Sequence, residues 1–401
     1  MSVDQVNFRR VLMITSRQIP KEATSGRERT MSFILRALSA DSYPTIYRLK
    51  SVFEKNSVGR ALPIFVKGAR GLLSGNFIPL QTLIFFDPKA IPEIFELIDK
   101  EKPSTIYFDG VRSAIYVPIV RRRYPDLRII CDFDDLMSHR YKALYHSRQP
   151  ISIGYLKRLV PAWFQTHVIN GIFARGFMLY EGRALEKFED RLIDQVDAVV
   201  LVSDVEGKML RQRAVSGAEV VVIPPYAAAF DGKLQTTSIR RFIFIGSDSL
   251  LQNRLTIEYL VRLWKELHPR VSLHIFGKQE GDYPAVDNVV FEGFIDRLDQ
   301  AYSDGSVLLA PSFVRGGVKT KVLEAMSFGV IPVGNVTTFE GIDADCSGLS
   351  LSDAQLRDLI EAPQEAVDYL RHTGIKVISS AMETHSESRL ANAWRRVIWT
   401  N

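Results

Sequence analysis

A stretch late in the chain combines glycine, lysine and glutamate in an order suited to binding a diphosphate. Residues 316–329 read GGVKTKVLEAMSFG, and the apolar run Val330–Val333 follows at once. Apolar residues recur at helical spacing, and Gly329 is a typical residue at the end of a helix. The pattern therefore predicts a helix that begins near the two glycines and leads directly into a strand.

Such a helix start offers several groups that attract a diphosphate. Its first backbone N–H groups are unpaired and carry partial positive charge, and glycines let a ligand approach the backbone closely. Lys319 and Lys321 add two full charges, and Glu324 is placed to accept hydrogen bonds from a ribose. The alternative is an ordinary helix start with solvated lysines and a Glu324–Lys321 pair.

Size and composition indicate a globular protein of more than one domain. The 401 residues suggest two domains of about 150–220 residues each. Hydrophobic residues make up 46% and charged residues 24%, which is typical of a soluble protein. There is neither an 18-residue apolar run nor an N-terminal apolar signal segment. Cys131 and Cys346 are far apart and lack metal-ligand spacing, so we expect a cytoplasmic protein.

The net charge of +5 and the pI of about 9.0 permit anionic partners. No nucleic-acid-binding module is visible, so we expect no nucleic acid partner. Phosphate-bearing substrates and an anionic membrane surface fit the charge equally well. The segment 151–180 has aromatic residues with basic neighbours. It suits either packing in a core or peripheral contact with the inner face of a membrane.

Two successive series of apolar runs alternate with helical patterns. The first series of expected strands is Val11–Thr15, Thr45–Leu49, Thr105–Phe108, Arg128–Cys131, Ala198–Val202 and Val220–Ile223. The second is Phe242–Ile245, Val271–Phe276, Val289–Phe291, Val307–Leu309 and Val330–Val333. The runs are continuous rather than alternating, which is typical of parallel strands covered on both faces. The fold class is therefore α/β, doubly wound.

The expected domain boundaries follow from these two series. An N-terminal Rossmann-like domain spans 1–224, and a linker with Pro-Pro and Asp-Gly spans 225–240. A second Rossmann-like domain spans 241–380, and a terminal helix lies within 381–401.

Four groups of residues, spread over most of the chain, resemble the signatures of one family. They are Gly26–Arg27 before the first helix, Asp197–Ser203 in a strand, Phe244–Ser247 followed by Asn253–Arg254, and Gly317–Met326 followed by Gly329, Pro332 and Glu340–Gly341. The last group is the most specific. The chain resembles the GT-B glycosyltransferases and, within them, the retaining glycosyltransferase family 4 (group 1 glycosyltransferases).

The resemblance implies two Rossmann-like domains that face each other across a cleft, with the C-terminal helix packing back on the N-terminal, acceptor-side domain. The second domain would bind the nucleotide-sugar donor. It implies transfer of a sugar from a nucleotide-diphosphate sugar to a glycan or lipid-linked acceptor, with retention, in polysaccharide biosynthesis. Neither a cofactor nor a metal is implied, because the helix dipole and the lysines can neutralise the leaving diphosphate.

The resemblance also assigns candidate residues. The donor-binding set is Gly26, Gly246, Ser247, Asn253, Arg254, Gly277, Gly316, Gly317, Val318, Lys319, Lys321 and Glu324. The catalytic candidates are Asp134, Lys319 and Arg254, and the acceptor-side candidates are Arg27, Asp135 and Arg140.

Asp134 stands where the family often has a histidine, at the carboxyl end of a strand. A carboxylate there can orient an acceptor hydroxyl or accept its proton. Alternatively, the cluster Asp132, Asp134 and Asp135 caps the next segment and pairs with Arg140.

Two departures from the family pattern bear on activity. Gly316 stands where many members have the first glutamate of a Glu-x7-Glu pair, and Pro225–Tyr226 replaces a common Asn-Gly. A non-catalytic relative that binds nucleotide or glycan as a scaffold, or a nucleotide-sugar epimerase of the same fold, are therefore kept as alternatives. A dehydrogenase is disfavoured because no Gly-x-Gly-x-x-Gly follows Val11–Thr15.

Overall fold

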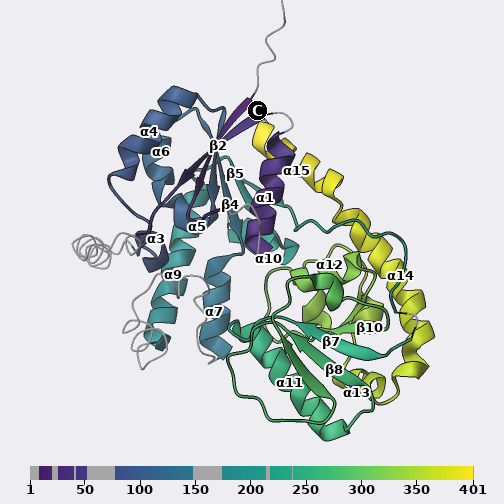
Figure 1. The fold of residues 1–401 in the computed structure, drawn as a ribbon. Coiled ribbons are helices and arrows are strands. Elements are labelled where there is room, and N and C mark those ends of the chain that lie inside the picture. Colours follow the sequence, from purple (N-terminus) through teal and green to yellow (C-terminus); the bar gives the residue numbers. More distant parts are fainter. Residues whose placement is uncertain are drawn as a thin grey trace, which may run out of the picture. The chain divides into compact units, whose positions relative to one another are not determined.

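The computed structural model describes residues 9–19, 26–39, 42–51, 77–147, 174–213, 217–236 and 238–400. The chain forms two compact units (Figure 1). Unit 1 contains the described residues from Arg9 to Ile223 together with those from Leu390 onward, and unit 2 contains Pro224–Arg389. Most of the aromatic segment 151–180, as far as residue 173, lies outside the described residues.

Unit 1 is built on a parallel sheet with the strand order β2-β1-β3-β4-β5-β6. Its strands are β1 (Arg9–Thr15), β2 (Ser42–Arg48), β3 (Thr105–Asp109), β4 (Arg128–Asp134), β5 (Ala198–Leu201) and β6 (Glu219–Val222). Its helices are α1 (Gly26–Ser39), α3 (Leu80–Leu83), α4 (Ala90–Glu101), α5 (Gly110–Ser113), α6 (Val117–Arg123), α7 (Met137–Ser147), α9 (Ala174–Ile193) and α10 (Asp204–Arg213). The strand order reverses between β1 and β3, which is where doubly wound sheets bind ligands.

Unit 2 has a second parallel sheet with the order β11-β10-β7-β8-β9. Its strands are β7 (Arg241–Ile245), β8 (Ser272–Phe276), β9 (Val289–Gly293), β10 (Ser306–Leu309) and β11 (Ile331–Val333). The main helices are α11 (Leu251–Leu267), α12 (Thr320–Ser327), α13 (Asp353–Glu361) and α14 (Val367–Thr384). Here the order reverses between β10 and β7, which places the expected ligand edge beside α11 and α12.

The strands have this arrangement because their side chains are apolar on both faces. In β1, residues 11–15 are all buried, and β3 and β10 are buried throughout. In unit 2, the buried Trp264 of α11 packs edge-to-face on Phe242 of β7, with ring centroids 5.7 Å apart. The prediction of two parallel Rossmann-like α/β sheets is confirmed.

Several strands extend beyond their expected bounds, and in β4 the added residues include a buried carboxylate. We expected the fourth strand to end at Cys131, but β4 continues to Asp134 and takes Asp132 into the sheet, fully buried. A carboxylate is tolerated at this position because a buried arginine, described below, lies beside it.

The helix α15 (Glu387–Trp399) returns the chain to unit 1. The carbonyl of Ile398 accepts a hydrogen bond from Thr105 Oγ1 at 2.9 Å. Arg128 Nη2 donates to the carbonyl of Val397 at 2.9 Å, and Trp394 packs edge-to-face on Tyr107. The last turns of α15 are thus part of the unit 1 core.

Residues 224–236, in the region expected to be a linker, hydrogen-bond to unit 2. The amide of Ala227 donates to the carbonyl of His385, and Thr236 Oγ1 donates to the carbonyl of Ser306 at 3.0 Å. Within the described part of the chain, no helix is long and apolar enough to span a membrane.

Candidate functional sites

The loops that follow β7 and β8 in unit 2 approach each other closely. Gly246 follows β7 and Gly277 follows β8. A Cβ on Gly277, where φ is +117°, would lie 2.7 Å from the carbonyl oxygen of Gly246. Gln279 Nε2 donates to the carbonyls of both glycines, at 3.1 and 3.0 Å. The glycines therefore create a narrow backbone edge that only residues without a Cβ permit.

Lys321 and Asn253 join α12 to the first of these loops. Lys321 Nζ donates to Asn253 Oδ1 at 2.7 Å, and Asn253 Nδ2 donates to the carbonyl of Ser247 at 2.8 Å. The ammonium also lies 4.1 Å from the centroid of the Phe244 ring. The alternative Lys321–Glu324 pair is therefore not what holds this lysine.

The electrostatic environment of Lys321 is unusual for a lysine. Burial, together with the neighbouring charge of Lys319, lowers its pKa to about 7. No carboxylate of the described residues lies within ion-pair distance of its ammonium. Within the described residues, this lysine therefore has no counter-charge.

The glycine loop before α12 is held by two charged side chains. Gly316 and Gly317 have φ values of +95° and +63°. Lys319 Nζ donates back to their carbonyls, at 2.8 and 3.3 Å. The amide of Gly316 donates to Glu340 Oε2 at 3.2 Å. We expected this amide and Lys319 to contact a phosphate, but here the amide is satisfied by Glu340 and Lys319 supports the loop.

Arg254 lies in the first turn of α11, one residue after Asn253. Its Nε is buried and has no hydrogen-bond partner within the described residues. An unpartnered donor of this kind usually indicates a missing ligand or water. Glu324 is partly buried one turn into α12, and Val318 lies in the loop before that helix.

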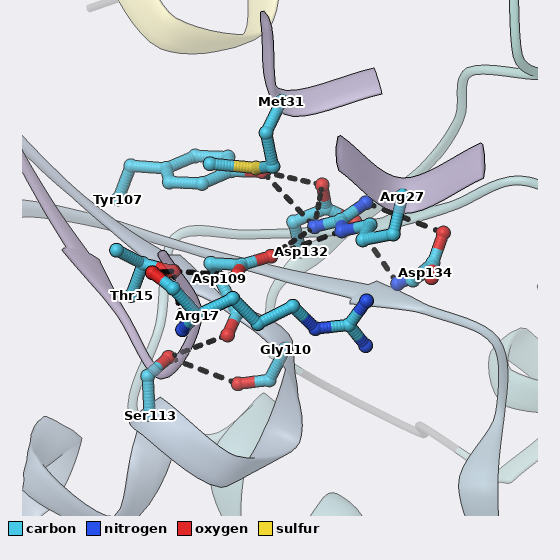
Figure 2. A network of polar contacts seen from close by, with 10 residues as sticks. All are labelled: Thr15, Arg17, Arg27, Met31, Tyr107, Asp109, Gly110, Ser113, Asp132 and Asp134. Atoms are coloured by element: carbon cyan, nitrogen blue, oxygen red, sulfur yellow. Dashed lines mark hydrogen bonds and ion pairs between the residues drawn. The ribbon is translucent and has the colours of Figure 1, made fainter. Parts of the chain in front are cut away.

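The second cluster lies in unit 1, at the carboxyl ends of β1, β3 and β4. Figure 2 shows the guanidinium of Arg27, from α1, between the carboxylates of Asp109, Asp132 and Asp134. Its Nη2 contacts Asp109 at 2.5 Å and Asp132 at 2.7 Å, and its Nη1 contacts Asp134 at 3.2 Å. The Tyr107 hydroxyl also donates to Asp132.

Burial and neighbouring charges shift the pKa values of this cluster in different directions. Burial disfavours the Arg27 cation, but the facing carboxylates of Asp132, Asp134 and Asp109 outweigh it and raise the pKa of Arg27. Burial also acts on Asp109, but Arg27 offsets it and holds the pKa of this carboxyl below its usual range. At Asp132, burial dominates and raises the pKa.

Asp134 differs from the other two aspartates because it reaches solvent. Its side chain is 31% exposed, against 2% for Asp109 and 1% for Asp132. Its backbone has a φ of +63°, and its amide donates to Asp132 Oδ1 at 2.9 Å. A non-glycine residue in this left-handed conformation is uncommon and often marks a functional position. The cluster therefore has one solvent-accessible carboxylate, that of Asp134, next to a buried network of ion pairs.

The remaining expected residues of unit 1 have different environments. Asp135 forms an ion pair with Arg140 at 3.4 Å, as the alternative interpretation of this cluster expected. Arg27 is buried, so in this structure its side chain contacts the aspartates rather than solvent. Gly26 begins α1 in unit 1, whereas the other donor-binding candidates lie in unit 2. Among the described residues, no three His, Cys, Asp or Glu side chains are grouped to hold a metal ion.

Sequence reasoning missed several members of both clusters. Tyr107 was expected only as a strand residue, and Asp109 and Gln279 received no role. Glu340 was named only as part of the family signature. A polar residue at the carboxyl end of an apolar strand is the signal that could have identified Asp109. No local pattern marks Gln279.

Residues 239–366 match the family described as Glycosyl transferases group 1. This segment contains both glycine loops, α11 and α12. This part of unit 2 is therefore similar to the group 1 glycosyltransferases. No curated protein sequence matches the chain. Similarity to solved structures instead covers nearly the whole chain, and it assigns the GT-B fold.

Three similar structures illustrate the extent of this likeness. Sucrose-phosphate synthase from Thermosynechococcus elongatus aligns with a TM-score of 0.65 at 14% identity, over 97% of this chain and 98% of that one. Anabaena Alr3699/HepE in complex with UDP aligns with a TM-score of 0.61 at 10% identity, over 98% of this chain and 100% of that one. The lipopolysaccharide outer core galactosyltransferase WaaB aligns with a TM-score of 0.59 at 12% identity, over 98% of this chain and 99% of that one. The GT-B resemblance expected from the motifs is confirmed.

Proposed function

We propose that this GT-B protein transfers a glycosyl unit from a nucleotide-diphosphate sugar, bound by unit 2, to an acceptor hydroxyl near Asp134 of unit 1. The observation that carries the proposal is the cationic group at the β10/β7 switch point. Lys321 has no counter-charge there, and the Nε of Arg254 has no partner within the described residues. A diphosphate supplies both a counter-charge and hydrogen-bond acceptors.

The chemistry requires charge stabilisation on the leaving group. The bond between the anomeric carbon and the phosphate oxygen breaks, and negative charge accumulates on the departing diphosphate. Lys321 and Arg254 would stabilise this charge, and the α12 N-terminus would add partial positive charge. We assign Lys319 to holding the Gly316–Gly317 loop against the same group.

The nucleoside would lie along the glycine edge, towards β8 and β9. These strands lie about 5 and 10 Å from β7 along the sheet, because neighbouring strands are about 4.8 Å apart. Gln279 Oε1 is buried there without a hydrogen-bond partner in the described structure. Phe294 follows β9 and is 76% exposed, so its ring is accessible to a base. We assign ribose binding to Glu324.

On the acceptor side, we assign Asp134 to orienting the acceptor hydroxyl or accepting its proton. Its exposure supports this role, and the Arg27 network beneath it fixes its orientation. We further propose retention of anomeric configuration, no metal requirement and a glycan or lipid-linked acceptor, which rest on the resemblance to family 4. UDP is the first nucleotide to test, because the HepE structures contain UDP, in one case with glucose and in another as UDP-glucose.

A donor-turnover assay tests the proposal. Purified protein is incubated with UDP-glucose, UDP-galactose or UDP-N-acetylglucosamine, with and without a pool of saccharide acceptors, and released UDP is measured. Acceptor-dependent UDP release that is lost in Asp134→Asn would support a transferase. Conversion of one sugar nucleotide into another without an acceptor would identify an epimerase. Nucleotide binding without turnover of any donor would favour a non-catalytic scaffold.

A further inference from the structure

A small cavity opens in unit 1, at the carboxyl end of β2. Its volume is about 190 Å³, and its walls come from the end of β2, the segment before α4 and the short helix Ala114–Tyr116. Tyr47 and the buried Phe85 and Tyr116 supply its aromatic lining. Lys50 and Lys89 supply cationic groups.

The cavity is connected to the network by hydrogen bonds. Leu49, in its wall, donates its amide to the carbonyl of Thr15 at 2.8 Å. Thr15 Oγ1 in turn donates to Asp109 Oδ2 at 2.8 Å, and Asp109 contacts Arg27. The cavity therefore lies at the same carboxyl edge of the sheet as the cluster beneath Asp134.

The polar groups of the cavity are unequally satisfied. Glu93 accepts a hydrogen bond from the Tyr47 hydroxyl at 2.6 Å, and Asp87 Oδ1 accepts one from the amide of Lys89 at 3.0 Å. By contrast, the ammonium groups of Lys50 and Lys89 have no ion-pair partner within the part of the chain described. These two lysines therefore offer a ligand positively charged hydrogen-bond donors, next to two carboxylates that already accept hydrogen bonds.

The size of the cavity limits what it can hold. Pockets for drug-sized ligands usually enclose about 300–1,000 Å³, and each liquid water takes about 30 Å³. A volume of about 190 Å³ is thus too small for a nucleotide sugar but sufficient for a phosphate or carboxylate with a few attached atoms. The donor is excluded as its occupant, and one charged end of a larger molecule fits.

We propose that this cavity binds an anionic group, a phosphate or carboxylate, carried by the acceptor. The inference rests on the proposed function, because it assumes that unit 1 receives the acceptor. Lys50 and Lys89 bind the anion at the carboxyl end of β2. Asp134 ends β4 at the same edge of the sheet, three strands or about 14 Å away, so the remainder of a larger acceptor would extend along this edge towards Asp134. The acceptor class is thereby narrowed from any glycan to one with a charged substituent or a phosphate link.

Direct binding to the full chain tests the inference without requiring turnover. Glycerol 3-phosphate is titrated by NMR or calorimetry, with glycerol as the uncharged comparison. We expect the phosphate ester to bind and glycerol not to bind. The double variant Lys50→Gln/Lys89→Gln should weaken binding by about fivefold or more, since each exposed ion pair contributes up to about 1 kcal/mol.

The matched control is Lys100→Gln, an exposed lysine at the opposite end of α4, which should leave the affinity unchanged. Equal loss in Lys100→Gln, equal binding of glycerol, or no binding of glycerol 3-phosphate would overturn the inference. Flotation with vesicles of phosphatidic acid against phosphatidylcholine distinguishes a lipid-borne phosphate from a soluble one. UDP binding, measured on the same samples, reports the donor site separately, so failure of the cavity and failure of the proposed function are distinguishable.

Discussion

Lys321 is the residue on which the proposed donor site depends most. Its ammonium rests on an amide oxygen and an aromatic ring rather than on a carboxylate, and its pKa is lowered to about 7. Both features follow from placing a lysine at a partly buried position beside a second lysine. A bound diphosphate would supply the missing anionic partner and raise the pKa of Lys321, because an adjacent anion favours the charged form.

This environment predicts a pH dependence of nucleotide binding. Below pH 7 Lys321 is already charged, so binding needs no proton at this site. Above pH 7 the free protein must take up a proton when the diphosphate binds, so the Kd should rise by up to about tenfold per pH unit. Calorimetry with UDP between pH 7 and 9 measures this slope. Lys321→Arg should flatten it, and an equally steep slope in that variant would assign the proton to another group.

Asp134 carries the corresponding prediction on the acceptor side. Asp134→Asn removes the charge and the base but preserves the shape, so kcat should fall by about 100-fold or more. UDP affinity should stay within twofold of wild type, because the residue belongs to unit 1. The neighbouring Asp135→Asn is the control, since Asp135 is already paired with Arg140. An equal fall of kcat in the two variants, measured by steady-state kinetics, would contradict a special role for Asp134.

At the scale of elements, four segments of unit 1 meet at a single buried arginine. Arg27 from α1 contacts carboxylates from β3 and β4, and Thr15 of β1 completes the network. Removing one partner from a buried ionic group leaves uncompensated charge, which costs more than the pair contributes.

Arg27→Gln should therefore destabilise the protein by about 3–5 kcal/mol in chemical denaturation. The exposed Arg140→Gln should cost less than about 1 kcal/mol. Lowering the pH should restore part of the loss in Arg27→Gln, because protonation neutralises the aspartates that the arginine had balanced. A loss that does not respond to pH would show that packing, rather than charge, explains the defect.

The two glycine loops of unit 2 give a second prediction at this scale. In Gly277→Ala the new Cβ would meet the Gly246 carbonyl at 2.7 Å, in addition to the cost of a positive φ. Gly293→Ala has a positive φ as well, but nothing lies within 4 Å of its Cβ. We expect Gly277→Ala to be the more destabilising variant and to weaken UDP binding, measured by thermal shift. Similar effects of both would mean that the loops do not need their close contact.

Much of the architecture and many individual site residues could be predicted from the sequence, but the contacts that join the unit 1 residues into one network could not. Continuous apolar runs marked each strand, because burial on both faces leaves little room for polar residues. The glycine–lysine segment before α12 marked one site because its residues are close in sequence. Tyr107, Asp109 and Arg27 are brought together by strand order, and that order does not appear in local composition. β4 extended past Cys131 because Arg27, about a hundred residues away, stabilises Asp132 in the sheet.

At the scale of the whole molecule, each unit has its own candidate site at the carboxyl edge of its own sheet. A strand-order reversal lies at each, between β1 and β3 and between β10 and β7. Under the proposed function, the edge in unit 2 would bind the donor and the edge in unit 1 the acceptor. The C-terminal segment belongs to this description, because residues after Leu390 complete the core of the first unit.

A calorimetric comparison of UDP, GDP, ADP and pyrophosphate tests the proposed diphosphate site of unit 2 directly. The proteins compared are the wild type, Lys321→Gln and the control variant Lys265→Gln. Lys265 is an exposed lysine in the last turn of α11, at the end opposite Asn253. We predict that pyrophosphate and one nucleoside diphosphate bind the wild type and the control variant with equal affinity. Lys321→Gln should weaken both by about tenfold, the effect expected for one charge-assisted contact. Nucleotide binding that is unchanged in Lys321→Gln, or no binding to folded wild type at millimolar concentration, would contradict a diphosphate site at this edge of unit 2.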